Sequence, residues 1–267
     1  MPTTVITSAQ NARIKQLMLL QQKSSERREK GLFVVEGIRE TAQCAEAGFP
    51  IDTLFVCPDI YNAQGEPLPF SPDSVCECIE VPAQLYQKMA YRGTTEGVMA
   101  VARMRHDTLD SLPLPPSPLL IVLESVEKPG NVGAVLRTAD AAKADAVIVC
   151  DPLTDLYNPN LIRASLGARF TVPTIACSSE ECIAFLKKHA VTILTAQLQD
   201  SKPYYDTDML GPTAIVMGTE STGLTDQWRR HADAHIRIPM LGRVDSLNVS
   251  VSAAILLFEA VRQRQCR

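Results

Sequence analysis

Short apolar runs alternate with helix-length segments along the second half of the chain. Residues 119–123 form a run of five apolar side chains, as is typical of a strand in a parallel sheet that is covered on both faces. Because strands that alternate with helices form such sheets, the pattern predicts a doubly wound α/β domain. Further strands are expected at residues 146–150, 191–195, 214–217 and 235–238, and helices at about 131–142, 158–166, 179–189 and 225–231.

The first half repeats the alternation on a smaller scale. Strands are predicted at residues 32–36, 52–57, 77–81 and 98–102, and helices at 8–22, 37–47 and 82–90, with Ser8 as the expected N-cap of the first. Residues 106–118, HDTLDSLPLPPSP, include four prolines and show no periodicity. Proline stiffens the chain and removes backbone donors. We therefore expect an α/β domain at residues 1–106, a linker at 107–118 and a second domain at 119–267.

Composition narrows the class of protein. The chain has 267 residues, of which 46% are hydrophobic and 21% charged, with a net charge of −4, as is typical of a globular protein. It has no signal peptide and no run long enough to cross a membrane, which predicts a cytoplasmic protein. Residues 11–30 carry six Lys or Arg against two Glu. That segment either contacts nucleic-acid phosphates or forms a solvated helix face.

Cysteine and histidine spacing does not indicate a metal site. The chain has eight cysteines, and none of them belongs to a C-x-x-C pair. Reduced, buried thiols are therefore expected in place of disulfides or zinc ligands. His231 and His235 have helical spacing but no acidic or thiol partner at a matching offset. We expect them to be surface or capping residues and predict no metal.

Three polar or glycine-containing segments follow predicted strands. In the first, Asn131 can cap a helix, and Arg137 lies four residues after Gly133, on a face where it could bind a phosphate or form a structural salt bridge. In the second, residues 217–224, Gly218 and Gly223 flank Glu220. That segment either approaches a ligand through its backbone or is a plain glycine turn with a solvated carboxylate.

The third segment leads into the last helix, which we expect to begin near Ser246. Ser246 and Asn248 stand there among apolar residues, as caps of the helix or as functional groups. The chain has no G-x-G-x-x-G after a strand, no G-x-x-x-x-G-K-[ST] and no G-x-S-x-G. A dinucleotide site, a P-loop and a nucleophile elbow therefore lack their main support.

Together the three segments resemble the SpoU/TrmH family of RNA ribose 2′-O-methyltransferases, of the SPOUT class. The matching motifs are N-x-G-x-x-x-R at 131–137, M-G-x-E-x-x-G-L at 217–224 and I-P-M-x-G-x-x-x-S-L-N-V-S at 238–250. Residues 6–17 and 31–40 are similar to the family's substrate-binding domain. The resemblance implies a C-terminal segment threaded into a trefoil knot, S-adenosylmethionine bound in that knot, and a homodimer. It also implies structured RNA as substrate, and we expect ribosomal RNA in preference to transfer RNA.

The resemblance also implies roles for particular residues. Backbone groups near the cofactor would come from Thr195, Gly218, Ile238 and Leu247. The catalytic set would be Asn131, Arg137, Glu220, Ser246 and Asn248. A guanidinium is a poor base, so we expect Arg137 to anchor a phosphate and stabilise negative charge on the attacking oxygen. Two alternatives remain: a non-catalytic RNA-binding or ribosome-assembly factor, and a related enzyme that methylates a base nitrogen.

Overall fold

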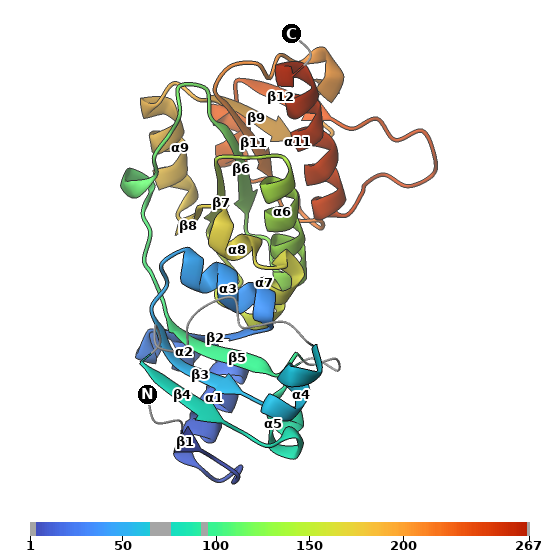
Figure 1. Ribbon diagram of the computed structural model, residues 1–267. Coiled ribbons are helices and arrows are strands. Elements are labelled where there is room, and N and C mark those ends of the chain that lie inside the picture. Colours follow the sequence, from blue (N-terminus) through green and yellow to red (C-terminus); the bar gives the residue numbers. More distant parts are fainter. Residues whose placement is uncertain (1–3, 65–75, 92–95, 266–267) are drawn as a thin grey trace. The chain divides into compact units, whose positions relative to one another are not determined.

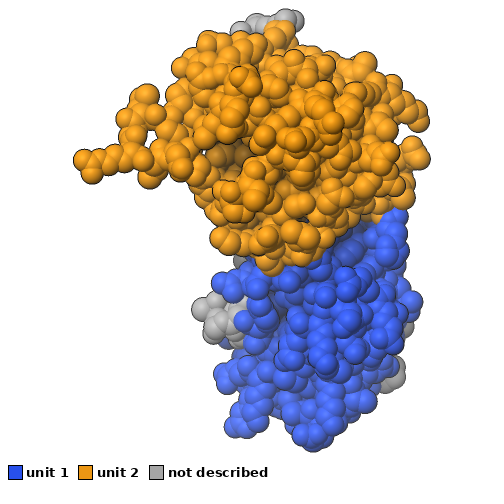
Figure 2. Space-filling model, turned by 180° about the vertical axis from the view of Figure 1, so that it is seen from behind, with its two compact units in different colours: residues 1–106, 155–171 blue, residues 107–154, 172–267 orange. Residues whose placement is uncertain are grey.

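The protein consists of two compact units. A computed structural model describes residues 4–64, 76–91 and 96–265 (Figure 1). Unit 1 comprises residues 1–106 and 155–171, and unit 2 comprises residues 107–154 and 172–267 (Figure 2). Residues 155–171 thus pack with unit 1, although the sequence pattern assigned them to the second domain. In the part of the chain that the structure describes, no helix is long and apolar enough to span a membrane.

Unit 1 is built on a mixed five-stranded sheet with the order β1-β4-β3-β5-β2. Strand β5 runs antiparallel to both β2 and β3, and the other pairs are parallel. The strands are β1 (Thr4–Val5), β2 (Leu32–Glu36), β3 (Ile51–Val56), β4 (Glu77–Glu80) and β5 (Val98–Arg103). The helices are α1 (Ala12–Gln22), α2 (Ser24–Lys30), α3 (Ile38–Glu46), α4 (Pro58–Tyr61), α5 (Ala83–Met89), α7 (Pro159–Ser165) and α8 (Ala168–Thr171).

Helix α1 starts later than its sequence pattern predicts. Its side chains Ile14, Leu17 and Leu20 are fully buried, as the helical period requires. The N-cap is Asn11, whose Oδ1 accepts a hydrogen bond from the backbone N–H of Arg13 at 2.8 Å. The expected cap, Ser8, instead accepts from the N–H of Gln10 at 3.2 Å. Both residues are good caps, so their order in the chain did not distinguish them.

Unit 2 is a parallel seven-stranded sheet with the order β10-β12-β9-β11-β6-β7-β8. This confirms the predicted parallel α/β domain. Its strands are β6 (Leu119–Glu124), β7 (Ala146–Cys150), β8 (Thr174–Cys177), β9 (Thr192–Ala196), β10 (Lys202–Pro203), β11 (Thr213–Met217) and β12 (Ala234–Arg237). Its helices are α6 (Pro129–Ala141), α9 (Ser179–Lys188), α10 (Asp226–His231) and α11 (Val249–Gln265).

Helices cover both faces of this sheet. Helices α6 and α11 pack against each other on one face, and α9 lies on the other with α10 beside it (Figure 1). The side chains of β6, β7 and β11 are buried throughout, which explains their continuous apolar sequences. Because parallel strands end at the same edge, the segments that follow β6, β9, β11 and β12 meet there.

Arg27 occupies a position that its sequence did not suggest. The residue is only 1% exposed. Its Nε lies 2.6 Å from Oδ2 of Asp155, and its Nη1 donates to the carbonyls of Leu20 and Gln21 at 2.6 and 3.2 Å. Arg27 therefore holds residues 155–171 to α2 within unit 1. Arg27 is therefore neither a phosphate contact nor part of a solvated helix face, the two roles predicted for the basic segment 11–30. Lys15, Lys23 and Arg28 of that segment are exposed.

Truncation of Arg27 should destabilise the protein. Arg27→Ala leaves Asp155 poorly exposed and without its cation, and we expect the free energy of unfolding to fall by about 3 kcal/mol. The exposed neighbour Arg28 provides the control. Arg28→Ala should change the free energy of unfolding by less than about 0.5 kcal/mol. Urea denaturation followed by circular dichroism measures both. Equal midpoints for the two variants would show that the buried pair contributes nothing to stability.

Candidate active site

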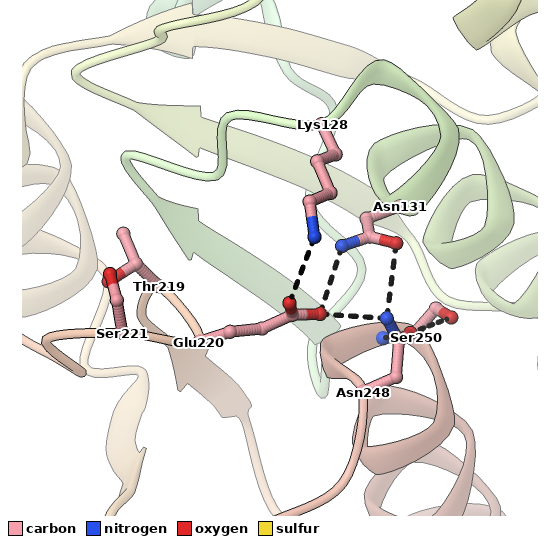
Figure 3. Close-up of polar contacts among 7 residues, drawn as sticks. All are labelled: Lys128, Asn131, Thr219, Glu220, Ser221, Asn248 and Ser250. Carbon is pink, nitrogen blue, oxygen red and sulfur yellow. Dashed lines mark hydrogen bonds and ion pairs between the residues drawn. The ribbon is translucent and has the colours of Figure 1, made fainter.

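Four polar side chains from three distant segments meet at the carboxyl edge of the unit 2 sheet (Figure 3). Oε1 of Glu220 accepts hydrogen bonds from Nδ2 of Asn131 at 3.1 Å and from Nδ2 of Asn248 at 2.7 Å. The same Nδ2 of Asn248 lies 3.2 Å from Oδ1 of Asn131. Nζ of Lys128 lies 3.4 Å from Oε2 of Glu220. Three residues predicted to act together, Asn131, Glu220 and Asn248, are therefore in direct contact.

Asn248 has two roles because its amide has two ends. Its Oδ1 accepts from the backbone N–H and the hydroxyl of Ser250, at 3.0 and 2.6 Å, and so caps the first turn of α11. That bond turns Nδ2 toward Glu220. The helix begins at Val249 and not near Ser246 as predicted. Ser246 does not cap it: the hydroxyl is exposed and donates to Oδ1 of Asp245 at 3.2 Å.

The loop that carries Glu220 is folded back tightly on itself. A Cβ on Gly218 would lie 2.3 Å from the carbonyl of Gly223, so only glycine fits there. Gly223 has a φ of +68°, a conformation that glycine adopts without strain. Beyond the loop, the N–H and hydroxyl of Thr225 donate to the buried carboxylate of Glu124 at 2.8 and 2.7 Å. The end of β6 thus holds the loop that presents Glu220.

The surroundings of Glu220 favour its ionised form. Desolvation acts to raise the pKa of this carboxyl. Hydrogen bonding by the Val249 N–H, the charge of Lys128 and donation by Lys128 and Asn131 outweigh it, and they hold the pKa below the ordinary value. Glu220 therefore remains a carboxylate down to a lower pH than a free glutamate. It can orient donors and balance positive charge at neutral pH, but it is a weak general base.

Two cavities adjoin this network. The larger, of about 330 Å³, lies between the segments that follow β9, β11 and β12 and the first turns of α11. The smaller, of about 160 Å³, lies between the loop after β6 and residues 218–221. Residues 218–221 and Val249 line both of them. Glu220 is therefore accessible to a ligand in either cavity.

The predicted cofactor residues divide between the cavity wall and the sheet. Gly218, Ile238 and Leu247 line the larger cavity, and so does Ser246. Thr195 does not: it is fully buried, and its hydroxyl lies 2.6 Å from Nδ1 of His235. The wall begins one residue later, at Ala196.

Arg137 does not join the network within this chain. The residue is exposed, lines neither cavity and forms no hydrogen bond or ion pair with any residue that the structure describes. It lies on the same helix as Asn131 but six residues later, which is about 9 Å along the axis and about 240° around it. Gly133, which lies four residues before Arg137, is buried.

Sequence reasoning missed three residues of the site. Lys128 precedes Asn131 by three residues at the start of α6, and that helical spacing could have indicated it. Ser250 fixes the Asn248 amide, and its role depends on where α11 begins. Gln197 lines the larger cavity, where its Oε1 is buried and has no hydrogen-bond partner in the described part of the chain. No sequence signal distinguishes it.

Comparison with known proteins identifies the family. The model of the SpoU rRNA Methylase family matches residues 118–258, which is more than half of the chain. The chain belongs to the SpoU family. The model of an MRM3-like substrate binding domain matches residues 11–100. The SpoU match contains the loop after β6, the Glu220 loop and the start of α11, and thus the whole network.

Individual relatives match this chain over almost its full length. A 23S rRNA (uridine(2479)-2′-O)-methyltransferase of Streptomyces viridochromogenes is 29% identical over 96% of this chain and 92% of the relative. A crystal structure of an RNA 2′-O ribose methyltransferase is 37% identical, with a TM-score of 0.82 over 98% of this chain and 99% of that one. An AdoMet-bound rRNA methyltransferase from Sinorhizobium meliloti is 28% identical, with a TM-score of 0.88 over 98% of both chains.

Substitution of Gly218 should disturb the loop without unfolding the sheet. Because its added Cβ would overlap the Gly223 carbonyl, we expect Gly218→Ala to destabilise the protein by about 2 kcal/mol. Amide hydrogen exchange should rise in residues 217–225. Gly211 has open space around it, so Gly211→Ala should change neither the stability nor the amide exchange of residues 217–225. Unaltered exchange in Gly218→Ala would mean that the close approach is not needed to hold the loop.

Proposed function

We propose that this chain transfers a methyl group from S-adenosylmethionine to the 2′-hydroxyl of a ribose in ribosomal RNA. The observation that carries the proposal is the position of Glu220, which is ionised, held by Lys128, Asn131 and Asn248, and placed in the common wall of two cavities. SpoU relatives named as 23S rRNA 2′-O-methyltransferases, and one structure with AdoMet bound, support the choice of donor and acceptor.

The larger cavity fits the cofactor. Its volume is in the range of small-molecule sites. Its wall combines apolar side chains such as Ile238 and Leu247 with polar ones such as Gln197 and Ser246. S-adenosylmethionine supplies a methyl group on a positively charged sulfur, and the carboxylate of Glu220 complements that charge. The methyl is already activated, so the reaction requires no metal ion.

The smaller cavity is the place for the ribose. Oε1 of Glu220 accepts from Asn131 and Asn248, Oε2 lies near Lys128, and the Val249 N–H also donates to this carboxylate. A carboxylate has about four lone-pair sites. Oε2 can therefore accept the 2′-hydroxyl and orient its oxygen toward the larger cavity. The Lys128 side chain is 72% exposed and can pair with a neighbouring phosphate. Positioning, and not strong base catalysis, is the main contribution of these groups.

A homodimer would complete the site with Arg137. The segment between β12 and α11 extends away from the body of unit 2 (Figure 1), and its Leu241 is 98% exposed. Val251 and Phe258 on α11 are each 47% exposed, which is costly for apolar side chains unless a second subunit covers them. Arg137 of the partner subunit would then anchor the RNA phosphate and stabilise the developing oxyanion.

Two further features belong to the same proposal. The chain leaves β12, which lies outside β9, and returns to pack α11 against α6 and over β6 and β11. A trefoil knot in this segment would hold the three cofactor loops together.

A ribosomal RNA substrate also favours the cytoplasmic location that was expected from the sequence.

The proposal is tested by identifying the methylated nucleoside. Ribosomal RNA is incubated with the full chain and isotopically labelled S-adenosylmethionine, digested to nucleosides and analysed by mass spectrometry. We expect the label in a 2′-O-methylribose. A labelled base would favour the base-methylating alternative, and no label in any ribosomal RNA fraction would favour a non-catalytic RNA-binding factor.

Removal of Arg137 should separate catalysis from cofactor binding. Arg137→Ala should lower the rate of methyl transfer at least a hundredfold, or about 2.7 kcal/mol, and leave the affinity for S-adenosylmethionine within about twofold. Arg230 is an exposed arginine of the same unit, and Arg230→Ala should change neither value. Normal turnover in Arg137→Ala would remove this residue from the mechanism.

Mixed dimers show whether Arg137 acts across the interface. When Arg137→Ala chains are combined with Glu220→Ala chains, one site of each heterodimer has Glu220 from the first chain and Arg137 from the second. If Arg137 acts in the partner's site, the mixture should regain activity that neither variant has alone. A mixture as inactive as its components would place both residues in the site of one chain.

Asn248→Asp should keep the helix cap and damage the network. Aspartate caps a helix as well as asparagine, but it places a carboxylate where Nδ2 now donates to Glu220 at 2.7 Å. Repulsion should raise the pKa of Glu220 and lower methyl transfer at least tenfold, or about 1.4 kcal/mol, with little change in melting temperature. Asn248→Ser retains a cap without the charge and should lose less activity. Equal losses in both variants would argue against the electrostatic explanation.

A further inference from the structure

Three cysteines converge in unit 2, although their spacing in the sequence indicated no site. Cys150 ends β7, Cys177 ends β8, and Cys182 lies on α9. Their Sγ atoms all lie within 4.8 Å of one another. We call these three residues the thiol cluster. In the described part of the chain, no other group of His, Cys, Asp or Glu side chains converges in this way.

The fold brings these side chains together from neighbouring elements. Cys150 and Cys177 are paired in register on the adjacent parallel strands β7 and β8, so their side chains leave the same face of the sheet. Helix α9 follows β8 directly, and Cys182 is on its buried side. Cys150 and Cys182 are fully buried, whereas Cys177 is partly exposed. Cys177 is therefore the least buried of the three cysteines.

This geometry suits a tetrahedral thiolate complex with one open position. Zinc–sulfur bonds of about 2.3 Å place the sulfur atoms of such a complex about 3.8 Å apart. Sulfurs already within 4.8 Å of one another can reach that spacing by small side-chain rotations. Three protein ligands leave the fourth position of a tetrahedral complex to a water molecule.

We propose that the thiol cluster binds one thiophilic metal ion, Zn²⁺, through the three sulfur atoms, with water as the fourth ligand. Binding gives a complex of one Zn²⁺ with three thiolates, and the protons that the three thiols carry before binding pass to the buffer.

Neighbouring carboxylates increase the attraction for a cation. Asp151 and Glu181 are both close enough to Cys177 to act on it electrostatically. They are not ligands, because Asp151 already accepts a bond of 2.6 Å from the Ser179 hydroxyl and Glu181 accepts from Ser178. A bound ion would join the last strand of the sheet, β8, to β7 and α9. It would thus brace the β8 side of the sheet, at the carboxyl ends of the strands. The proposal does not rest on the proposed methyl transfer.

Cobalt is a suitable probe for this site. The reduced, metal-free full chain is titrated with Co²⁺, and we expect one ion per chain with thiolate-to-cobalt charge-transfer absorption and the visible bands of tetrahedral coordination. Zn²⁺ should displace the cobalt and raise the melting temperature of the protein. Cys177→Ala should weaken Co²⁺ binding at least tenfold and abolish the thermal shift, because it removes the partly exposed ligand with little loss of core packing.

The controls separate metal binding from folding. Cys57→Ala removes a buried thiol of unit 1 outside the cluster and should leave the cobalt spectrum unchanged. Circular dichroism should show Cys177→Ala folded. Absence of charge-transfer absorption in the native chain, or its persistence in Cys177→Ala, would overturn the proposal. So would a disulfide within the cluster in protein that has bound no metal.

Discussion

The orientation of one amide group determines how the site is assembled. Asn248 Oδ1 is held by the first turn of α11, and this leaves its Nδ2 pointing at Glu220. Rotation of the Asn248 amide would bring Oδ1 against the carboxylate of Glu220 and leave the Ser250 N–H without a partner. The contacts of Oδ1 and of Nδ2 therefore favour the same orientation of the amide. The beginning of the last helix and the position of the carboxylate are therefore coupled. Lys128 and Asn131 then complete a network that keeps Glu220 ionised.

The sheet makes this coupling possible. Parallel strands β6 and β11 are neighbours, so the loops that follow them lie side by side at one edge. Glu124, at the end of β6, accepts two hydrogen bonds from Thr225, which lies just beyond the Glu220 loop. Groups that orient a substrate are more effective when they are fixed before it binds. The buried strands fix the positions of these groups, and the exposed loops carry the side chains that would contact a substrate.

Much of this arrangement could be predicted, because parallel strands and their following loops obey simple rules. Apolar runs located nine strands of the two units to within one or two residues, whereas β1, β8 and β10 were not predicted. The errors arose where several residues were equally suitable, as with Ser8 and Asn11 at the start of α1. They also arose where an element was short. Strands β1 and β10 have only two residues each, and β8 has four. Residues 155–171 contain no signal that they pack with unit 1.

Charge patterns were the least reliable guide, since they do not reveal burial. Arg27 was grouped with exposed cations, yet it is inside unit 1 and paired with a residue far along the chain. Arg137 was placed beside Asn131 in a motif, but the turn of the helix separates them.

By itself, the sequence determined the parallel α/β domain, its family and three members of the Glu220 network, because these depend on local periodicity and on motifs within single segments. Only the tertiary structure decided that Asn248 and not Ser246 caps α11, that Arg137 lies outside the network of its own chain, and that Cys150, Cys177 and Cys182 meet. Those outcomes depend on strand register and helix packing, which bring together residues that no spacing rule connects.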